Sequence, residues 1–248
     1  TVNKTERMKV TTCLNPLHTA MSVYGCMLGY DLICAEMKDE DIVALIKRLG
    51  YVEGLPVVVD PKILNPKAFI DEVIEQRLPN PFMPDTPQRI ATDTSQKVGI
   101  RFGETIKSYV AEGRDLNTLV SIPLAIAGWL RYLLAIHHLA QQSTEVSPLA
   151  LAQAMGVTKP SVTSILTSLM KQGVIVRRRY GKIYITDRGV LYARYYDELV
   201  EKILQHFPLA GEGFTPEECY SAAVAMAVSL PAREIDERCE ALYDNENK

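Results

Sequence analysis

The stretch Met8–Ala20, MKVTTCLNPLHTA, places a lysine, an asparagine and a histidine within one or two helical turns of one another. Asn15 and His18 are three residues apart, so they share one face if the segment is helical. Pro16 predicts that the helix begins near Asn15, with Asn15 as the N-cap and Pro16 at the first helical position. The stretch therefore predicts a helix whose start is surrounded by polar side chains.

Lys9, Asn15 and His18 are residue types suited to the chemistry of alcohols and ketones. A partly desolvated lysine can exchange a proton with a hydroxyl or carbonyl oxygen near neutral pH. Asparagine and histidine can hold that oxygen while charge develops on it. The alternative is a capped core helix in which His18 is a hydrogen-bonded core residue and Lys9 a solvated charge. Spacing alone favours this structural alternative.

The composition indicates a globular protein with one large domain or two ordinary ones, since 47% of the 248 residues are hydrophobic and 23% are charged. The net charge of -3 gives no argument for a polyanionic partner of the whole chain. Five cysteines without a CxxC pair favour free thiols in a reducing compartment. We find no signal-peptide pattern and no uninterrupted apolar run of membrane-spanning length, so we expect a cytoplasmic protein without a membrane segment. The first residue is Thr, which leaves open that the natural start lies upstream.

Apolar residues at helical spacing predict a mainly α-helical first half. Gly50 is expected to end one of these helices, and Gly25 and Gly29 to admit a closely packed neighbour. A charged row along the fourth helix is typical of a solvated face, although part of it would also suit a polar cleft. The expected helices are Thr19–Leu32, Asp39–Leu49, Pro66–Leu78, Thr86–Tyr109 with a break near Gly99, and Asp115–Ala135, with Tyr51–Pro66 extended or looped; the row is Arg89, Asp93, Lys97, Arg101 and Glu104.

Four motifs in this order resemble the C-terminal helical domain of the mannitol dehydrogenase family, which comprises long-chain polyol and uronate dehydrogenases. Fructuronate reductases are the most similar by pattern, and the resemblance covers about residues 1–134. The motifs are LNPLHTA (Leu14–Ala20), GYD (Gly29–Asp31), RLPNPFMPDTPQRIATDTSQK (Arg77–Lys97) and IPLAIAGWLRYLL (Ile122–Leu134).

The resemblance implies a substrate domain that closes over a nicotinamide held by a preceding Rossmann domain. It implies that Lys9 is the general acid and base, that Asn15 and His18 position the reacting oxygen, and that Arg89 and Lys97 bind substrate. The family usually places its lysine five residues before the asparagine, whereas Lys9 is six before Asn15. The catalytic assignment of Lys9 therefore requires a one-residue bulge or a loop change.

The cofactor expected for the family is NAD, but the chain contains no G-x-G-x-x-G motif. We therefore expect the dinucleotide-binding domain to be absent and this chain alone to be inactive. A second departure is that the family normally continues beyond Trp-Leu-Arg-Tyr with helices of its own, which this sequence does not show.

From Tyr132 onward the pattern predicts a winged helix. Leu133–Gln141 is the expected first helix, and Ser147 and Pro148 begin a second, Leu149–Met155. A third helix, Pro160–Lys171, is followed by a hairpin of Val174–Val176 and Ile183–Ile185. The region from residue 156 to residue 194 has a net charge of +7, and residues 195–248 have a net charge of -8.

Short hydroxyl side chains and cations on the third helix suit the major groove of double-stranded DNA, and an arginine-rich hairpin tip suits phosphates. A winged helix used only for protein contacts is the alternative. The apolar face of the third helix is expected to be buried, which leaves the opposite face exposed to bind DNA. The DNA-binding candidates on this exposed face are Lys159, Ser161, Thr163, Ser164 and Thr167. The candidates on the hairpin are Arg177, Arg178, Arg179 and Lys182.

This half resembles the iron- and manganese-dependent repressors, which implies a homodimer through Arg194–Ala241 and a metal site. The positions that correspond to metal ligands hold Arg131, Leu134, Ala225 and Met226, so we expect no regulatory metal.

The expected domains are residues 1–134 (substrate domain), 135–190 (DNA-binding domain) and 191–248 (helical dimerisation segment). No linker separates the first two, because Trp129–Ile136 completes one motif and begins the other. Either one helix serves both modules or the join is artificial. The leading hypothesis is the substrate domain of a polyol or uronate oxidoreductase fused to a DNA reader. The alternative is a metal-independent transcriptional regulator that senses a sugar acid or only binds DNA.

Overall fold

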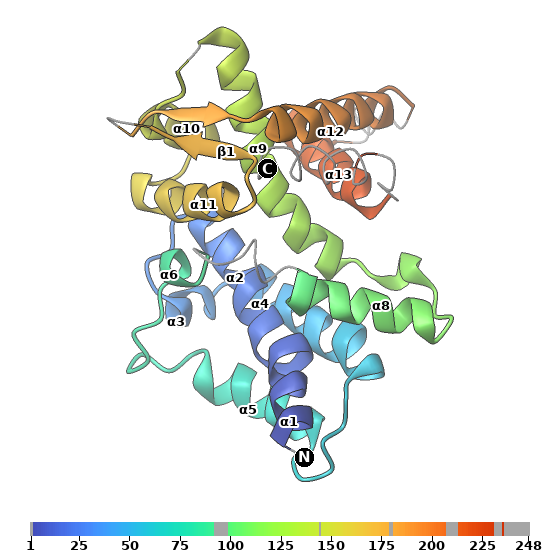
Figure 1. Ribbon diagram of the computed structural model, residues 1–248. Helices are drawn as coiled ribbons and strands as arrows, with labels where there is room; N and C mark the ends of the chain where they lie inside the picture. The colour runs from blue at the N-terminus through green and yellow to red at the C-terminus, as the bar shows by residue number, and fades with distance from the viewer. Residues whose placement is uncertain are drawn as a thin grey trace, which may run out of the picture. The chain divides into compact units, whose positions relative to one another are not determined.

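The computed structural model is mainly helical and describes residues 2–91, 99–143, 145–178, 181–206, 213–230 and 235 (Figure 1). The chain forms two compact units, and neither is a single continuous segment. The first contains residues 1–125 and 157–168, and the second contains residues 126–156 and 169–248. Most of the helix expected to read DNA is thus part of the first unit.

The first unit is built from α-helices that run on into short π- or 3-10-helical turns. Four of the turns, η1, η2, η4 and η5, are π-helical, a form that no pattern in the sequence had predicted. In chain order the elements are α1 (Val2–Met8), η1 (Lys9–Cys13), α2 (Asn15–Leu28), α3 (Ile33–Glu36), α4 (Glu40–Lys47), η2 (Arg48–Gly54), η3 (Leu55–Val57), α5 (Pro66–Glu72), η4 (Val73–Arg77), α6 (Pro87–Ala91), η5 (Gly99–Gly103), α8 (Glu104–Ala111) and η6 (Leu116–Thr118), followed by the start of α9 (Ser121–Gln142) and most of α11 (Lys159–Lys171).

Helix α2 is the central helix of the first unit and packs against α6, α4 and α3 (Figure 1). Leu17, Ala20 and Met21 are fully buried, as the helical spacing predicts. Gly29 ends the helix in the left-handed conformation, with φ 81°. Gly29 is therefore the C-cap of α2. It does not serve the close helix packing that the sequence predicted for it.

The other glycine of that pair, Gly25, accommodates a side chain. A Cβ atom at Gly25 would lie 2.1 Å from Oε1 of Glu36, so only glycine lets this carboxyl group rest against α2. Glu36 is fully buried, and neither of its carboxyl oxygens has a hydrogen-bond partner among the described residues. Burial and the nearby charge of Asp39 raise the pKa of Glu36 to about 9.

Two predictions for residues 48–57 are wrong. Gly50 does not end α4, because the helix continues through η2 to Gly54, and the segment from Tyr51 to Val57 is helical and not extended. The physical reason is Glu53, whose buried carboxylate accepts hydrogen bonds from the backbone N–H groups of residues 120, 121 and 122 at 2.9, 2.7 and 3.0 Å. These are the orphan donors at the start of α9, so η2 caps a helix that is distant in sequence.

Helix α9 is one continuous element that runs through Trp129–Ile136, so one helix serves both motifs, as the first of the two alternatives for this join predicted. It is long and apolar enough to cross a membrane, but 56% of its most apolar window is buried inside the protein. That burial is typical of a core helix. The four described cysteines, Cys13, Cys26, Cys34 and Cys219, are free thiols as expected.

The second unit contains α10 (Pro148–Met155), the strands β1 (Ile175–Arg177) and β2 (Ile183–Ile185), and the helices α12 (Asp187–His206) and α13 (Pro216–Ser229). The predicted cap is confirmed, since Ser147 accepts a hydrogen bond from the backbone N–H of Ala150 at 3.0 Å. The predicted hairpin is also confirmed, with Ile175 opposite Ile185 in an antiparallel pair. Helices α12 and α13 pack side by side (Figure 1).

Candidate substrate site

Lys9 and Asn15 lie at the two ends of the π-helical turn η1. The backbone N–H of Leu14 donates to the carbonyl of Lys9 at 3.1 Å, a bond that spans five residues and accommodates one residue more than an α-helical turn. This is the one-residue bulge that the spacing of Lys9 and Asn15 required. The Lys9 side chain is 32% exposed, and its ammonium pairs with Glu6 at 3.2 Å.

Asn15 is the first residue of α2, and the N-cap is Leu14, so the prediction of Asn15 as N-cap is wrong by one residue. No side chain caps this helix. The amide of Asn15 forms no hydrogen bond with any other described residue, whereas its backbone carbonyl accepts one from the Thr19 hydroxyl at 2.9 Å. The amide group is therefore free to bind a ligand oxygen.

His18 is a half-buried residue in the first turns of α2. Burial lowers its pKa from 6.5 to about 4, Asp85 opposes the shift, and the positive charges of Arg77, Arg101 and Arg89 add to it. The imidazole is consequently neutral near pH 7, and its charged neighbours are one carboxylate and three guanidinium groups. A neutral imidazole can donate one hydrogen bond and accept another.

Arg89 is 67% exposed and pairs with Asp85 four residues earlier, and the charges of both residues act on His18. To bind a substrate, the guanidinium of Arg89 would either bind it while it stays paired with Asp85 or break that ion pair. The second predicted substrate residue, Lys97, lies outside the described residues.

Arg101 is the site residue that sequence reasoning missed. The charged row suggested a solvated face, but Arg101 is only 7% exposed, and its guanidinium donates to the hydroxyl of Thr19. Thr19 in turn donates to the carbonyl of Asn15, so Arg101 is linked to the start of α2 through one side chain. The glycines on either side of Arg101, at both ends of η5, were the one available signal of an unusual helix.

The predicted outward face of α11 is only partly exposed. Ser161 is fully buried near Cys26 of α2, and its hydroxyl hydrogen-bonds that of Thr158 at 2.9 Å, so the prediction that it points outward is wrong. Lys159 and Thr163 are exposed, but the hydroxyls of Thr163 and Thr167 donate to carbonyls of their own helix at 3.1 and 3.0 Å. The side chain of Ser164 lies outside the described residues.

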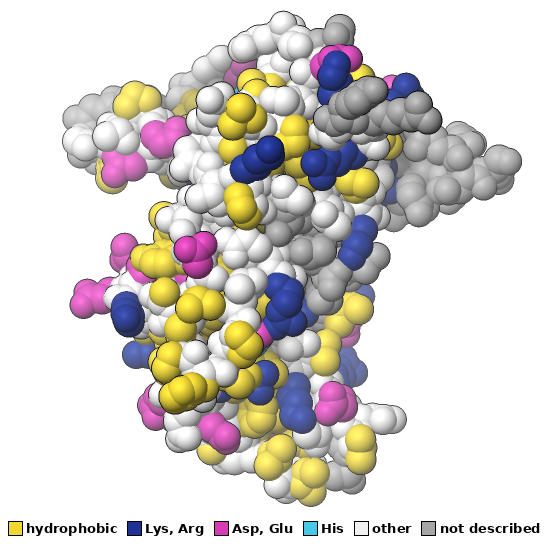
Figure 2. Space-filling view, turned by 90° about the vertical axis from the view of Figure 1, so that its left-hand side faces the viewer, with side chains coloured by type: hydrophobic (Ala, Val, Ile, Leu, Met, Phe, Trp, Pro, Cys, Tyr) yellow, Lys and Arg dark blue, Asp and Glu magenta, His cyan; other side chains and the backbone are white. Residues whose placement is uncertain are grey.

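The hairpin presents Arg177 and Arg178 to solvent, while Arg179 lies outside the described residues. Arg178 also lies over the ring of Tyr184, 5.5 Å from its centroid, and Lys182 forms an ion pair with Glu145. On the face in Figure 2, the described Lys and Arg side chains are scattered among acidic and apolar ones.

Comparison with known proteins identifies the family of the larger part of the chain. Residues 1–169 match the family model of the mannitol dehydrogenase C-terminal domain, which extends beyond residue 134 into α11. The chain is 63% identical over 138 residues to the D-mannonate oxidoreductase of Thermotoga maritima, covering 55% of this chain and 25% of that protein. It is 30% identical over 124 residues to the altronate oxidoreductase of Halalkalibacterium halodurans, covering 50% and 24%. The chain thus spans about a quarter of the length of these relatives.

A solved structure resembles the chain over a longer range. The ternary complex of Pseudomonas fluorescens mannitol 2-dehydrogenase with NAD and D-mannitol aligns with 98% of this chain and 42% of that one, with a TM-score of 0.50 and 19% identity. At that identity the likeness concerns the fold alone.

Proposed function

Because the chain belongs to the mannitol dehydrogenase C-terminal domain family, we propose that it is the substrate domain of a nicotinamide-dependent oxidoreductase that acts on a sugar acid. The observation that supports the choice of a sugar acid over a neutral polyol is the presence of three guanidinium groups, those of Arg77, Arg89 and Arg101, close enough to act on His18 together with the single carboxylate of Asp85. A guanidinium binds a carboxylate through two parallel hydrogen bonds, which a neutral polyol cannot offer. The two relatives described above are also named for sugar acids.

The proposed roles follow from the side chains. Lys9 exchanges a proton with the oxygen of the reacting hydroxyl or carbonyl group, because it is the first residue of the turn that leads to Asn15. The free amide of Asn15 and the neutral imidazole of His18 hydrogen-bond that oxygen as its charge changes. Arg101 fixes Thr19 and thereby the first turn of α2. Arg89 binds the carboxylate, with Lys97 proposed as a further contact.

NAD supplies the hydride acceptor in this class of reaction. The described residues contain only an antiparallel strand pair and no parallel strand with a glycine-rich turn, so they do not fit a dinucleotide. We therefore assign substrate binding and proton exchange to this chain, and dinucleotide binding to a Rossmann domain outside the printed sequence. Free thiols in the described part of the chain suit the reducing cytoplasm as its location.

The test of substrate class is an NMR titration of the His18 imidazole with D-mannonate and, separately, with D-mannitol. D-mannonate is expected to shift the His18 resonances and to raise the pKa of His18, because a bound carboxylate stabilises the imidazolium. D-mannitol is expected to leave that pKa unchanged, and exposed His206 is the internal control. Equal responses to both ligands, or no response to D-mannonate, would contradict the proposal.

The test of the acid and base is enzymatic. The N-terminal part of the T. maritima D-mannonate oxidoreductase would be joined to this chain, and NAD-dependent oxidation of D-mannonate measured. Lys9→Ala is expected to lower kcat by about 100-fold or more, as loss of a general acid or base does. Lys4→Ala, an exposed lysine on α1, is the matched control. If Lys9→Ala retains the activity, the assignment of Lys9 is wrong.

A second candidate function rests on the exposed Arg177 and Arg178 of the hairpin, which would suit phosphate contacts. In this proposal the chain is a homodimeric, metal-independent regulator that binds double-stranded DNA. Salt-dependent retardation of a duplex, lost when Arg177, Arg178 and Arg179 are replaced by Ala, is the expected result. Retardation that those replacements leave unchanged would exclude the hairpin as the binding element.

A further inference from the structure

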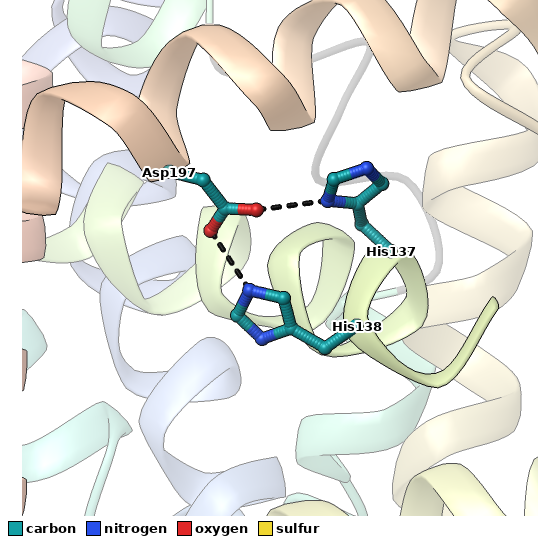
Figure 3. A group of neighbouring side chains, drawn as sticks. All are labelled: His137, His138 and Asp197. Atoms are coloured by element: carbon teal, nitrogen blue, oxygen red, sulfur yellow. Dashed lines mark hydrogen bonds and ion pairs between the residues drawn. The ribbon is translucent and has the colours of Figure 1, made fainter. Parts of the chain in front are cut away.

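Three side chains of the second unit converge on one point. His137 and His138 are neighbours on α9, and Asp197 reaches them from α12 (Figure 3). Consecutive residues on a helix point about 100° apart, so both rings meet one group only if it lies between their directions. The carboxylate of Asp197 is in that place, since one oxygen is 2.8 Å from Nδ1 of His137 and the other is 3.0 Å from Nε2 of His138.

We propose that His137, His138 and Asp197 bind a divalent transition-metal ion of the zinc class. Two imidazole nitrogens and a carboxylate oxygen form the donor set that Zn²⁺ accepts with three protein ligands. One ligand atom from each residue lies within 4.8 Å of the other two. The sequence led us to expect no metal, but that expectation concerned the positions of Arg131, Leu134, Ala225 and Met226, and the group in Figure 3 uses none of them.

The two nitrogen–oxygen distances require little change for a metal to enter. In a tetrahedral zinc site a ligand nitrogen and a ligand oxygen are roughly 3.4 Å apart, given bond lengths of about 2.0–2.2 Å. The two nitrogen–oxygen distances of 2.8 and 3.0 Å would therefore open by about half an ångström. Each ring must present a lone pair where it now faces the carboxylate, so the proton moves to its other nitrogen or, from an imidazolium, to solvent.

Burial and charge also suit a metal site with an open position. The side chain of His137 is 7% exposed and that of Asp197 is 17% exposed, whereas that of His138 is 48% exposed. Two ligands are therefore held by packing, and the third lies at the surface, where an ion and a water molecule have access. Glu201 lies one turn after Asp197 on α12 and adds negative charge to the same helix face.

The experiment is calorimetric titration of the chelator-treated chain with ZnCl₂, its thiols alkylated beforehand. We expect one ion per chain with a Kd of about 10 μM or tighter. Asp197→Asn, His137→Gln and His138→Gln should each weaken binding at least 10-fold, which is the range for loss of a ligand or its orienting partner. His138→Gln is the most informative variant, because the side chain of His138 is exposed and its replacement should leave the fold intact. His206→Gln, an exposed histidine on α12, is the matched control and should bind as the parent chain does.

A second measurement separates a metal site from a purely structural hydrogen-bonded triad. Co²⁺ bound to nitrogen and oxygen ligands gives visible d–d bands, and these should appear with the parent chain and with His206→Gln, and be lost with His138→Gln. If Zn²⁺ does not bind below about 1 mM, or if the three ligand variants bind it as the parent chain does, the triad is structural and the proposal is wrong.

Discussion

Replacing Glu36 by glutamine should stabilise this protein at neutral and alkaline pH. The carboxyl group is fully buried beside Gly25, and no described residue hydrogen-bonds either of its oxygens. Its pKa of about 9 means that the folded chain holds it neutral at pH 7, whereas in the unfolded chain it ionises above its ordinary value of 4.5. Glutamine keeps the shape and is neutral in both states.

The size of the effect follows from proton linkage. Between pH 4.5 and about 9 the folded state binds one more proton at Glu36 than the unfolded state does, so stability falls as pH rises. The loss is about 1.4 kcal/mol per pH unit, which gives about 3 kcal/mol at pH 7 and about 5 kcal/mol at pH 8. Glu36→Gln should recover these amounts and differ little from the parent chain at pH 4.5.

The assay is urea unfolding followed by circular dichroism at pH 5, 7 and 8. Glu40→Gln, which removes an exposed carboxylate from the next helix, is the control and should show no such gain. If Glu36→Gln and the parent chain lose stability in parallel between pH 5 and pH 8, the carboxyl group is not neutral in the folded state. A loss of stability in Glu36→Gln at every pH would mean that Glu36 is ionised and paired, and the reasoning would fail.

Three further outcomes test the packing and the site. Glu53→Ala should cost roughly 3–5 kcal/mol in unfolding free energy, because three backbone N–H groups at the start of α9 lose their acceptor; a loss below about 1 kcal/mol would refute that role. Gly25→Ala should cost about 1–3 kcal/mol, since its Cβ would overlap the buried carboxyl of Glu36, and the smaller Glu36→Ala background should relieve this loss. Burial lowers the pKa of His18 to about 4 in the folded chain, so the free energy of unfolding should have its full value above pH 6.5 and decline as the pH falls toward 4. His18→Gln should remove that decline from urea unfolding curves. An unchanged curve would exclude a buried neutral imidazole.

The elements that the sequence predicted well are those with local signals at their ends. Ser147 and Pro148 start α10, Gly156 and Gly173 adopt positive φ after helices, and alternating apolar residues form the β1–β2 hairpin. These signals depend on the conformational preferences of single residues and their near neighbours, so they can be recognised in one sequence.

The features that the sequence did not reveal depend on partners far along the chain. Arg101 and Glu53 look like surface charges in a helical pattern, yet both are buried because of contacts with residues 82 and 67 to 69 positions away. Ser161 was placed on an exposed face by its spacing, but α11 is covered on that side by α2 through the Cys26 contact. Hydrophobic periodicity shows which face of a helix is apolar and therefore buried. It gives no information on whether another element also covers a polar face of the same helix.

The π-helical turn η1 is neither fully predicted from the sequence nor wholly unexpected. A residue inserted into a helix normally rotates everything after it by about 100°, which would turn Asn15 and His18 away from Lys9. A π-helical turn absorbs the extra residue in one wider loop, so the flanking segments keep the rotational relation they would have without it. The spacing of six between Lys9 and Asn15 required a one-residue bulge or a loop change, and the hydrogen bond from Leu14 to Lys9 closes a turn that holds one extra residue. The extra residue between Lys9 and Asn15 is thus accommodated by the π-helical turn. The proposed roles of Lys9, Asn15 and His18 are therefore compatible with this spacing.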